Sequence, residues 1–184
     1  EEERRRPRKN QSSSQAEVNR EEEEEAGRVE EARRRAGRTV RWLENLPRQA
    51  ARVSMRGMGL GYADAVVTAE HVKRGGRSLE EMDLKNNDLD LSSMQVLLPA
   101  LGGCSGLKGL ALGDNPIFTN MGERDVEVVQ MLLANLKTVK LEKLGLGSTG
   151  MDDKSLRGLV EVLPSFRSLK VLGLSGNRLT SEGV

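Results

Sequence analysis

Cysteine, histidine and aromatic side chains are scarce in this chain of 184 residues. The sequence contains one Cys, one His, one Trp, one Tyr and two Phe. A zinc cluster or a disulfide framework needs more Cys and His than this, and a single His leaves little basis for a Ser-His-Asp relay. We therefore predict an aliphatic core, no cofactor and no catalytic or metal-binding residues, so that the protein is not an enzyme.

The sequence also lacks an excess of charge and a long apolar run. The net charge is +1, which gives no general attraction to nucleic acids or membranes. The longest uncharged stretch, residues 91–107, contains Ser, Gln, Pro and Gly and is too polar to span a bilayer. The charged opening residues do not form a signal peptide, and the lone Cys104 suits a reducing compartment. We predict a cytoplasmic or nuclear location, with neither nucleic acid nor membrane as partner.

Residues 1–48 form a charged, low-complexity segment with 13 basic and 12 acidic side chains. The first 20 residues bury too little apolar surface to offset the entropy of ordering, so we expect them to be disordered. Acid-before-base pairs four residues apart support a helix from about residue 16 to residue 45. Its apolar face, at helical spacing, consists of Val29, Ala32, Ala36, Val40 and Leu43.

This predicted helix has two interpretations. In the first it binds a partner, for instance as a coiled coil. In the second its bulky apolar end, with Trp42, Leu43 and Leu46, covers the open end of the domain that follows. We favour the cap, because the ends of stacked repeats need one.

An internal repeat dominates residues 49–184. Four copies of the pattern L-x-x-L-x-L-x-x-N-x-L begin at Leu79, Leu107, Leu141 and Leu169, and a degenerate copy begins near Ala50. The steps between starts are 29, 28, 34 and 28 residues. The alternating leucines predict a half-buried strand, and the Asn predicts a turn in which its amide bonds to the backbone. The second half of each unit has apolar residues at helical spacing, so each unit is a strand and a helix that stack on their neighbours. The predicted helical faces are Met94, Leu97, Leu98 and Leu101 in the first full repeat and Leu156, Leu159, Val160 and Leu163 in the third.

This pattern resembles the leucine-rich repeat. The step of 28–29 residues with a full helix resembles the ribonuclease-inhibitor-like subtype, which also occurs in NOD-like receptors and the Ran GTPase-activating protein. The resemblance implies an α/β fold, namely an open horseshoe or solenoid of parallel strands with outer helices, with about five repeats of which the last is truncated. It also implies an intracellular protein. Because the chain lacks an initiating Met and stops at Val184, we interpret it as a fragment of a longer protein.

Some positions depart from the repeat or mark its helices. In the third copy Thr149 replaces the Asn, and a hydroxyl can bond to fewer backbone groups. The long third step places extra residues around 118–124, either as a binding insertion or as a tolerated surface loop, and an exposed Phe118 would favour binding. Suitable helix N-caps are Ser92 or Ser93 in one copy and Asp152 or Asp153 in another.

The repeat predicts which side chains line the concave face of the sheet, namely those around each L-x-L. They carry both charges early in the chain and become small at Ala111, Gly145 and Gly173. We interpret this row as a protein-binding face that admits the close approach of a backbone, and the alternative is an ordinary solvated surface. The candidate binding residues are Arg52, Arg56, Glu81, Asp83, Lys85, Lys108, Asp114, Lys143 and Lys170.

Four other features carry no chemistry in our interpretation. His71 lies in a predicted helix with no identifiable nucleophile. Cys104 follows a predicted helix and is interpreted as structural. The glycines at 57–61 lack the Lys-Ser/Thr ending of a phosphate loop and belong to a repeat turn. The basic cluster at 4–9 is preceded by three Glu and is interpreted as a solvated tail.

The sequence thus predicts a non-enzymatic protein-interaction module whose partner is a protein. One alternative is a regulator of a small GTPase, since the Ran GTPase-activating protein shares the repeat subtype. Arg56 and Arg124 are available arginines, but neither can be matched to that activity. A further alternative is a structural spacer in a cytoskeletal or ciliary assembly, docked by the charged N-terminal helix.

Overall fold

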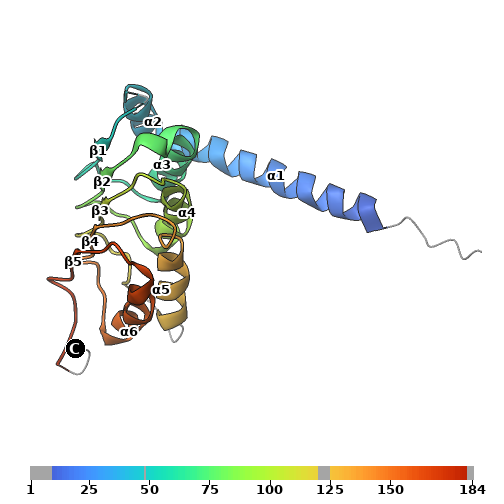
Figure 1. Cartoon of the computed structure of the whole chain (residues 1–184). Helices are drawn as coiled ribbons and strands as arrows, with labels where there is room; N and C mark the ends of the chain where they lie inside the picture. Colours follow the sequence, from blue (N-terminus) through green and yellow to red (C-terminus); the bar gives the residue numbers. More distant parts are fainter. Residues whose placement is uncertain (1–9, 48, 120–124, 182–184) are drawn as a thin grey trace, which may run out of the picture.

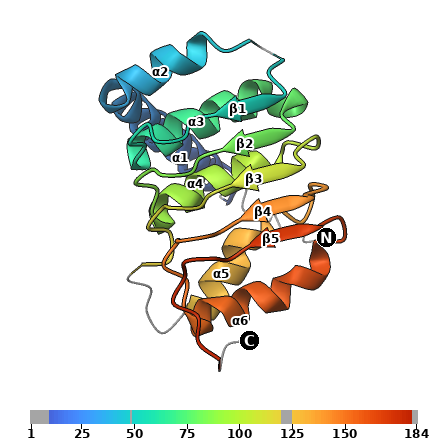
Figure 2. The ribbon, with the colours of Figure 1, turned by 90° about the vertical axis from the view of Figure 1, so that its left-hand side faces the viewer.

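Five parallel strands form one sheet in the computed structural model, and helices cover one of its faces (Figure 1 and Figure 2). The structure describes residues 10–47, 49–119 and 125–181. The strand order follows the chain, β1-β2-β3-β4-β5, so each strand lies beside the next one in sequence. The fold class is therefore α/β, as the sequence predicts.

The unit that repeats is a three-residue strand, a turn and a helix. The strands are β1 (Arg52–Ser54), β2 (Glu81–Asp83), β3 (Gly109–Ala111), β4 (Lys143–Gly145) and β5 (Val171–Gly173). The helices between them are α3 (Tyr62–Gly75), α4 (Leu91–Gly102), α5 (Asp125–Ala134) and α6 (Asp153–Val162), with short 3-10 turns η1 (Gly76–Ser78) and η2 (Leu163–Ser165). Two helices precede the sheet, α1 (Asn10–Arg35) and α2 (Gly37–Glu44).

The core contains the repeated aliphatic positions. Met82 of β2, Leu110 of β3 and Leu144 of β4 pair in register and are each buried. Leu172 of β5 continues this line but is only partly buried, because no described strand lies beyond β5. The predicted helical face of the first full repeat is confirmed, since its members are buried to 2% exposure or less: Met94, Leu97, Leu98 and Leu101.

The corresponding prediction for α6 is wrong at one position. Leu156 and Leu159 are buried and Leu163, just after α6, is partly buried, but Val160 is 52% exposed and Val162 is buried in its place. Leu98, at the same offset in α4, has further helices after it, whereas α6 is the last helix in the part of the chain that the structure describes. Periodicity cannot reveal where the stack of covering helices stops.

Asparagine side chains join consecutive repeats. The Asn87 amide donates to the Leu84 carbonyl at 2.8 Å and to the Met55 carbonyl of the preceding repeat at 3.0 Å. Asn115 does the same one repeat later, and Asn177 does so with Leu146 and Leu174. Because each amide has two N–H groups, it can satisfy carbonyls in two repeats at once.

Thr149 interrupts this ladder, as the sequence predicts. Its hydroxyl bonds to the Leu146 carbonyl of its own repeat at 2.9 Å and to the Asn177 amide oxygen at 3.2 Å. It has no amide with which to reach the preceding repeat. The Leu112 carbonyl therefore receives a side-chain donor from Asn115 alone among the hydrogen bonds of the described residues.

Two helix caps are aspartates. Asp152 accepts from the Ser155 backbone N–H at 2.9 Å, which confirms one predicted cap and lowers the pKa of Asp152, chiefly through this bond. In α4 the cap is Asp90, which accepts from the Ser93 N–H at 2.9 Å. The prediction of Ser92 or Ser93 is wrong because the helix begins at Leu91, so that both serines lie inside it, and the Ser93 N–H is the donor to the cap.

The N-terminal segment is more helical than the sequence indicates. The expected disorder of the first 20 residues is wrong from Asn10 onward, where α1 begins, and residues 1–9 lie outside the described residues. The predicted single helix is broken at Ala36, whose ψ of 29° separates α1 from α2. Ion pairs of the predicted kind occur along α1, including Glu24 with Arg28 and Glu31 with Arg35.

Helix α2 lies over the first repeat, while much of α1 extends away from the sheet and its helices (Figure 1). The predicted apolar stripe faces the protein, since Ala32, Ala36 and Leu43 are buried. The Thr39 hydroxyl of α2 donates to the Asp64 carboxylate of α3 at 2.6 Å. The other Asp64 oxygen accepts from the Gly61 N–H at 3.0 Å. The Asp64 side chain therefore both caps the N-terminus of α3 and bonds α3 to α2.

Candidate functional site

The strand register arranges the outward side chains of the sheet in two rows. The first row runs across β1 to β5 as Arg52, Glu81, Gly109, Lys143 and Val171. The second row, two residues further along each strand, is Ser54, Asp83, Ala111, Gly145 and Gly173. We call these ten positions the sheet face. They lie on the side away from α3 to α6 (Figure 1).

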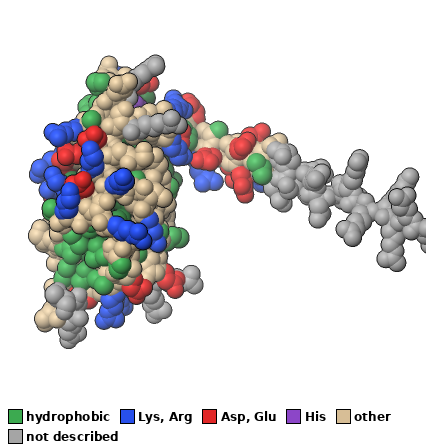
Figure 3. All heavy atoms as spheres, in the orientation of Figure 1, with side chains coloured by type: hydrophobic (Ala, Val, Ile, Leu, Met, Phe, Trp, Pro, Cys, Tyr) green, Lys and Arg blue, Asp and Glu red, His purple; other side chains and the backbone are tan. Residues whose placement is uncertain are grey.

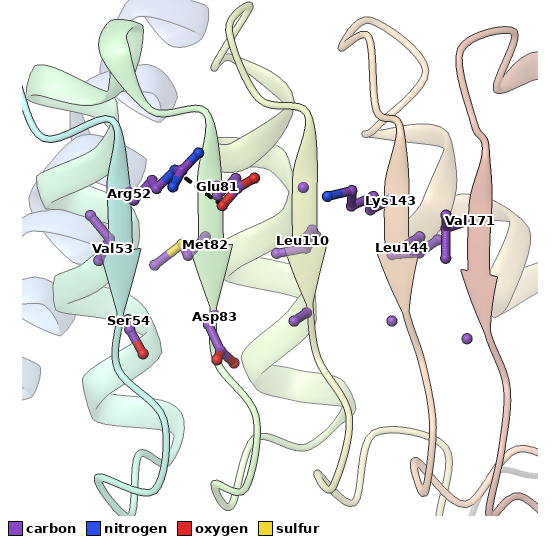
Figure 4. A pocket seen from close by; sticks show the side chains of 14 residues that line it. Arg52, Val53, Ser54, Glu81, Met82, Asp83, Leu110, Lys143, Leu144 and Val171 are labelled. Carbon is purple, nitrogen blue, oxygen red and sulfur yellow. Dashed lines mark ion pairs between the residues drawn. The ribbon is translucent and has the colours of Figure 1, made fainter.

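A hollow of about 440 Å³ lies over the sheet face and is lined from all five strands (Figure 4). Its floor is formed by backbone and small side chains at β3, β4 and β5, and Val171, which is 54% exposed, stands at one end. At the other end Arg52 and Glu81 form an ion pair with an N···O distance of 3.3 Å. The volume falls within the range of about 300–1,000 Å³ that is common for ligand sites.

Charge is unevenly distributed over this side of the molecule. Figure 3 shows charged side chains gathered level with β1 to β3 and hydrophobic side chains gathered level with β5 and below it. In the two rows, β1 and β2 contribute Arg52, Glu81 and Asp83, whereas β3 to β5 contribute a single charged residue, Lys143. The hollow is thus polar at one end and apolar at the other.

The structure brings some predicted binding residues together and separates others. Arg52, Glu81, Asp83 and Lys143 line the hollow. Lys108 and Lys170 lie one residue before β3 and β5, outside the two rows, and pair with Glu80 at 3.2 Å and Glu142 at 2.8 Å. The Lys170 ammonium, by hydrogen bonding and charge, lowers the pKa of the Glu142 carboxyl.

The remaining predicted residues follow the strands. Arg56 and Lys85 come two residues after β1 and β2, beside the hollow rather than among its lining residues. Asp114 lies in a turn and has a positive φ of 58°. Asn86 and Ser148, at the equivalent positions of other repeats, also have positive φ. The prediction missed two uncharged members of the face, Val171, which is exposed, and Gly109, which is buried, because it did not keep one offset in every repeat.

Among the described residues, the Lys143 ammonium over the hollow has no carboxylate partner. Its neighbours Lys108 and Lys170 are paired, and Glu81 is engaged by Arg52. In Figure 4 the Glu81 and Lys143 side chains point toward one another across β3, but they form no ion pair. The Lys143 ammonium therefore extends over the floor of the hollow, and it can accept an external anion.

The glycines of the floor are not required by the backbone. Gly145 and Gly173 are absent from the residues with positive φ, so an L side chain is compatible with their conformation. A Cβ built on Gly145 would meet its nearest atom, the Ala111 Cα, at 3.6 Å, and one on Gly173 would meet the Gly145 Cα at 3.8 Å. Both are ordinary contacts. Gly inside a strand weakens it, so Gly145 and Gly173 leave space over the sheet while they lower the stability of the strands.

The other residues that the sequence analysis singled out lie outside the hollow. Burial of Cys104, which is 2% exposed, raises the pKa of its thiol, so it is a poor nucleophile. His71 lies on α3, and its partial burial together with Arg74 lowers its pKa. Phe118 is 5% exposed and gives no support to a binding insertion, and the adjoining residues 120–124, with Arg124, lie outside the described residues. Gly57 and Gly59 have positive φ and form a turn.

The described residues hold neither a metal-binding cluster nor a helix that could cross a membrane. No group of three or more His, Cys, Asp or Glu side chains among residues 10–47, 49–119 and 125–181 is arranged to hold a metal ion. No helix in the same part of the chain combines the length and apolarity needed to cross a membrane. The basic cluster at 4–9 is not among the described residues.

Comparison with known proteins identifies no family. No family model matches the chain, and no curated protein matches it. Among solved structures the chain is similar to an internalin from Listeria monocytogenes, with 20% sequence identity and a TM-score of 0.34. The match covers 62% of this chain and 32% of the internalin chain, so the protein spans about a third of that structure. A similarity of this size transfers no function.

Proposed function

We propose that the chain is a leucine-rich repeat module of an intracellular protein, and that its sheet face binds another protein without catalysing a reaction. In this proposal residues 49–184 are the repeat domain, an open solenoid of the ribonuclease-inhibitor-like subtype, and residues 1–48 include its N-terminal cap. The units of strand, turn and helix, the in-register leucines and the asparagine ladder support the repeat assignment.

The observation that carries the binding proposal is the hollow with its glycine floor. A sheet surface that only contacts water gains nothing from Gly145 and Gly173, where β-branched residues would favour the strand. A surface that receives another chain gains space for close approach. The mixed charges at the β1 and β2 end can orient such a partner, because charge complementarity fixes register and rejects wrong partners.

The test fills the hollow without removing any existing contact. In Gly145→Val/Gly173→Val the new side chains occupy the floor, and circular dichroism checks that the sheet remains folded. The matched control, Lys154→Glu/Arg157→Glu, changes exposed residues of α6 on the far side. Affinity capture from cell extract is expected to retain a protein with the native chain and the control but not with the filled variant. A protein retained equally by all three would contradict the proposal.

The projecting helix supports a second function, that of a spacer docked through α1. Much of α1 extends away from the rest of the molecule (Figure 1), and ion pairs such as Arg20 with Glu24 lie within the helix, while Glu25 pairs with Lys73 of α3 at 3.8 Å. In that case a chain lacking residues 1–30 would lose its partner, while the filled variant would keep it. A small GTPase among the captured proteins would instead call for a GTP-hydrolysis assay with the native chain and Arg56→Ala.

A further inference from the structure

We propose that the hollow receives an extended segment of a partner protein in which an aliphatic side chain and a carboxylate lie two residues apart. The aliphatic side chain packs on the glycine floor at Gly145 and Gly173, within diagonal reach of Val171 in the other row, and the carboxylate pairs with Lys143. This inference rests on the proposed function, since it names the chemistry of the partner that the sheet face binds.

The floor selects the aliphatic side chain. Gly145 pairs in register with Ala111 and Gly173, so the Ala111 methyl group and the Gly173 backbone flank it, and the Val171 side chain lies diagonally across from it in the other row. None of these groups offers a charge, and a polar side chain buried against them would lose its water without a compensating hydrogen bond. Val171 is 54% exposed, so covering it removes apolar surface from water.

Lys143 selects the carboxylate. The neighbouring lysines are neutralised by Glu80 and Glu142, and the Arg52 guanidinium neutralises Glu81. Asp83 accepts a hydrogen bond from the Lys85 N–H at 3.0 Å. Lys143 is thus the cation over the hollow that has no ion pair among the described residues, and a carboxylate on the partner can pair with it. Partial enclosure in the hollow makes such a pair stronger than a fully exposed one.

The spacing selects an extended segment. Lys143 and Gly145 are two residues apart on one face of β4, which corresponds to about 6.6–6.8 Å along a strand. Side chains at positions i and i+2 of an extended chain also lie on one face with the same separation. A partner strand lying along β4 therefore places an aliphatic residue over Gly145 and a carboxylate over Lys143 together. In a helix, residues two apart point to different sides.

Peptide selection tests the chemistry without knowledge of the natural partner. A phage-displayed library of random linear peptides is selected on the whole chain, immobilised through a terminal tag. We expect the selected peptides to share an aliphatic residue with Asp or Glu two positions away. Lys143→Glu and Gly145→Val should each weaken their binding at least about tenfold, the size of effect expected for a lost charge pair or a blocked pocket. Lys154→Glu, an exposed lysine of α6, should change it less than about twofold, since distant exposed charges are screened.

The possible results separate this inference from the proposed function. Selected peptides without an acidic residue, or with unchanged affinity for Lys143→Glu, would overturn the inference, and loss of their binding to Gly145→Val would still support the sheet face as the site. If no peptide is selected, or if the peptides bind Gly145→Val as well as the native chain, both fail. Should Gly145→Val not fold, Gly173→Val fills the same floor and takes its place.

Discussion

The asparagine ladder gives a prediction whose size follows from counting buried partners. Asn115→Ala removes an amide that donates to the Leu112 carbonyl at 2.8 Å and to the Leu84 carbonyl at 2.9 Å, and that accepts from the Leu89 N–H at 3.1 Å. Leu84 keeps its bond from Asn87 at 2.8 Å. The Leu89 N–H loses Asn115 as its acceptor. The Leu112 carbonyl also loses its side-chain donor, because the Thr149 hydroxyl bonds within its own repeat and does not reach Leu112.

The expected loss is large. Each buried polar group left without a partner costs about 1–3 kcal/mol, so Asn115→Ala should lower the free energy of unfolding by about 2–6 kcal/mol. The comparison variant is Thr149→Ala, in which the Leu146 carbonyl keeps its bond from Asn177 at 2.7 Å. Its expected loss is about 1–2 kcal/mol, from one hydroxyl and one methyl group.

Urea unfolding followed by circular dichroism measures both losses, with ΔG taken from the linear dependence on denaturant. The two variants must have the same slope as the native chain for the difference to report on the folded state. Equal losses of stability in Asn115→Ala and Thr149→Ala would contradict this prediction, because they would show that the hydrogen bond between repeats adds nothing to the bonds within one turn.

Three further predictions follow from packing, charge and burial. Gly158→Ala should destabilise the fold by about 1–3 kcal/mol, because its Cβ would lie 2.6 Å from a backbone carbonyl oxygen of α5. Gly27→Ala, with nothing within 4 Å of the new Cβ, should stabilise α1 by about 0.5–1 kcal/mol. Thermal unfolding measures both changes, and a change of stability with the same sign in both variants would contradict the prediction. Because the pKa of Asp152 is lowered in the folded state, its charge stabilises the protein above the ordinary Asp pKa and ceases to do so as the pH falls through the lowered value. Unfolding of Asp152→Asn across this range should therefore show a deficit that disappears in acid, and a deficit independent of pH would argue against the cap as its source. The Cys104 thiol should react with a disulfide reagent only after urea unfolds the chain, and rapid labelling of the native protein would show that the site is open.

The positions of the strands and of the buried leucines could be predicted from the sequence. The leucine positions of all four copies mark the strands, and Leu79, Leu107 and Leu141 at their starts are buried. The degenerate copy near Ala50 was also identified correctly, since Met55 is buried and β1 pairs with β2. These predictions succeed because burial imposes a period of two on a strand, and a period of three to four on a helix, within a single stretch of chain.

Predictions that depended on elements far apart in the chain were less successful. Asp90 was missed as a cap because its role depends on where the chain enters α4. Lys108 was placed on the binding face, but it precedes β3 and pairs with Glu80 of the neighbouring repeat. Val160 was placed in the core, although no described helix covers that side of α6. In each case the outcome depends on an exact register or on a neighbour that periodicity does not specify.

The repeating unit, its parallel stacking and its aliphatic core can be predicted from the sequence, because each follows from the local spacing of apolar side chains. Which outward side chains meet depends on how the repeats pack against one another. Residues 81, 109 and 143 are separated by about thirty positions in the chain, yet the strand register sets them side by side and leaves Lys143 over a floor of small residues. Whether a charge is paired or free depends on distances between strands, and those distances exist only once the repeats are packed.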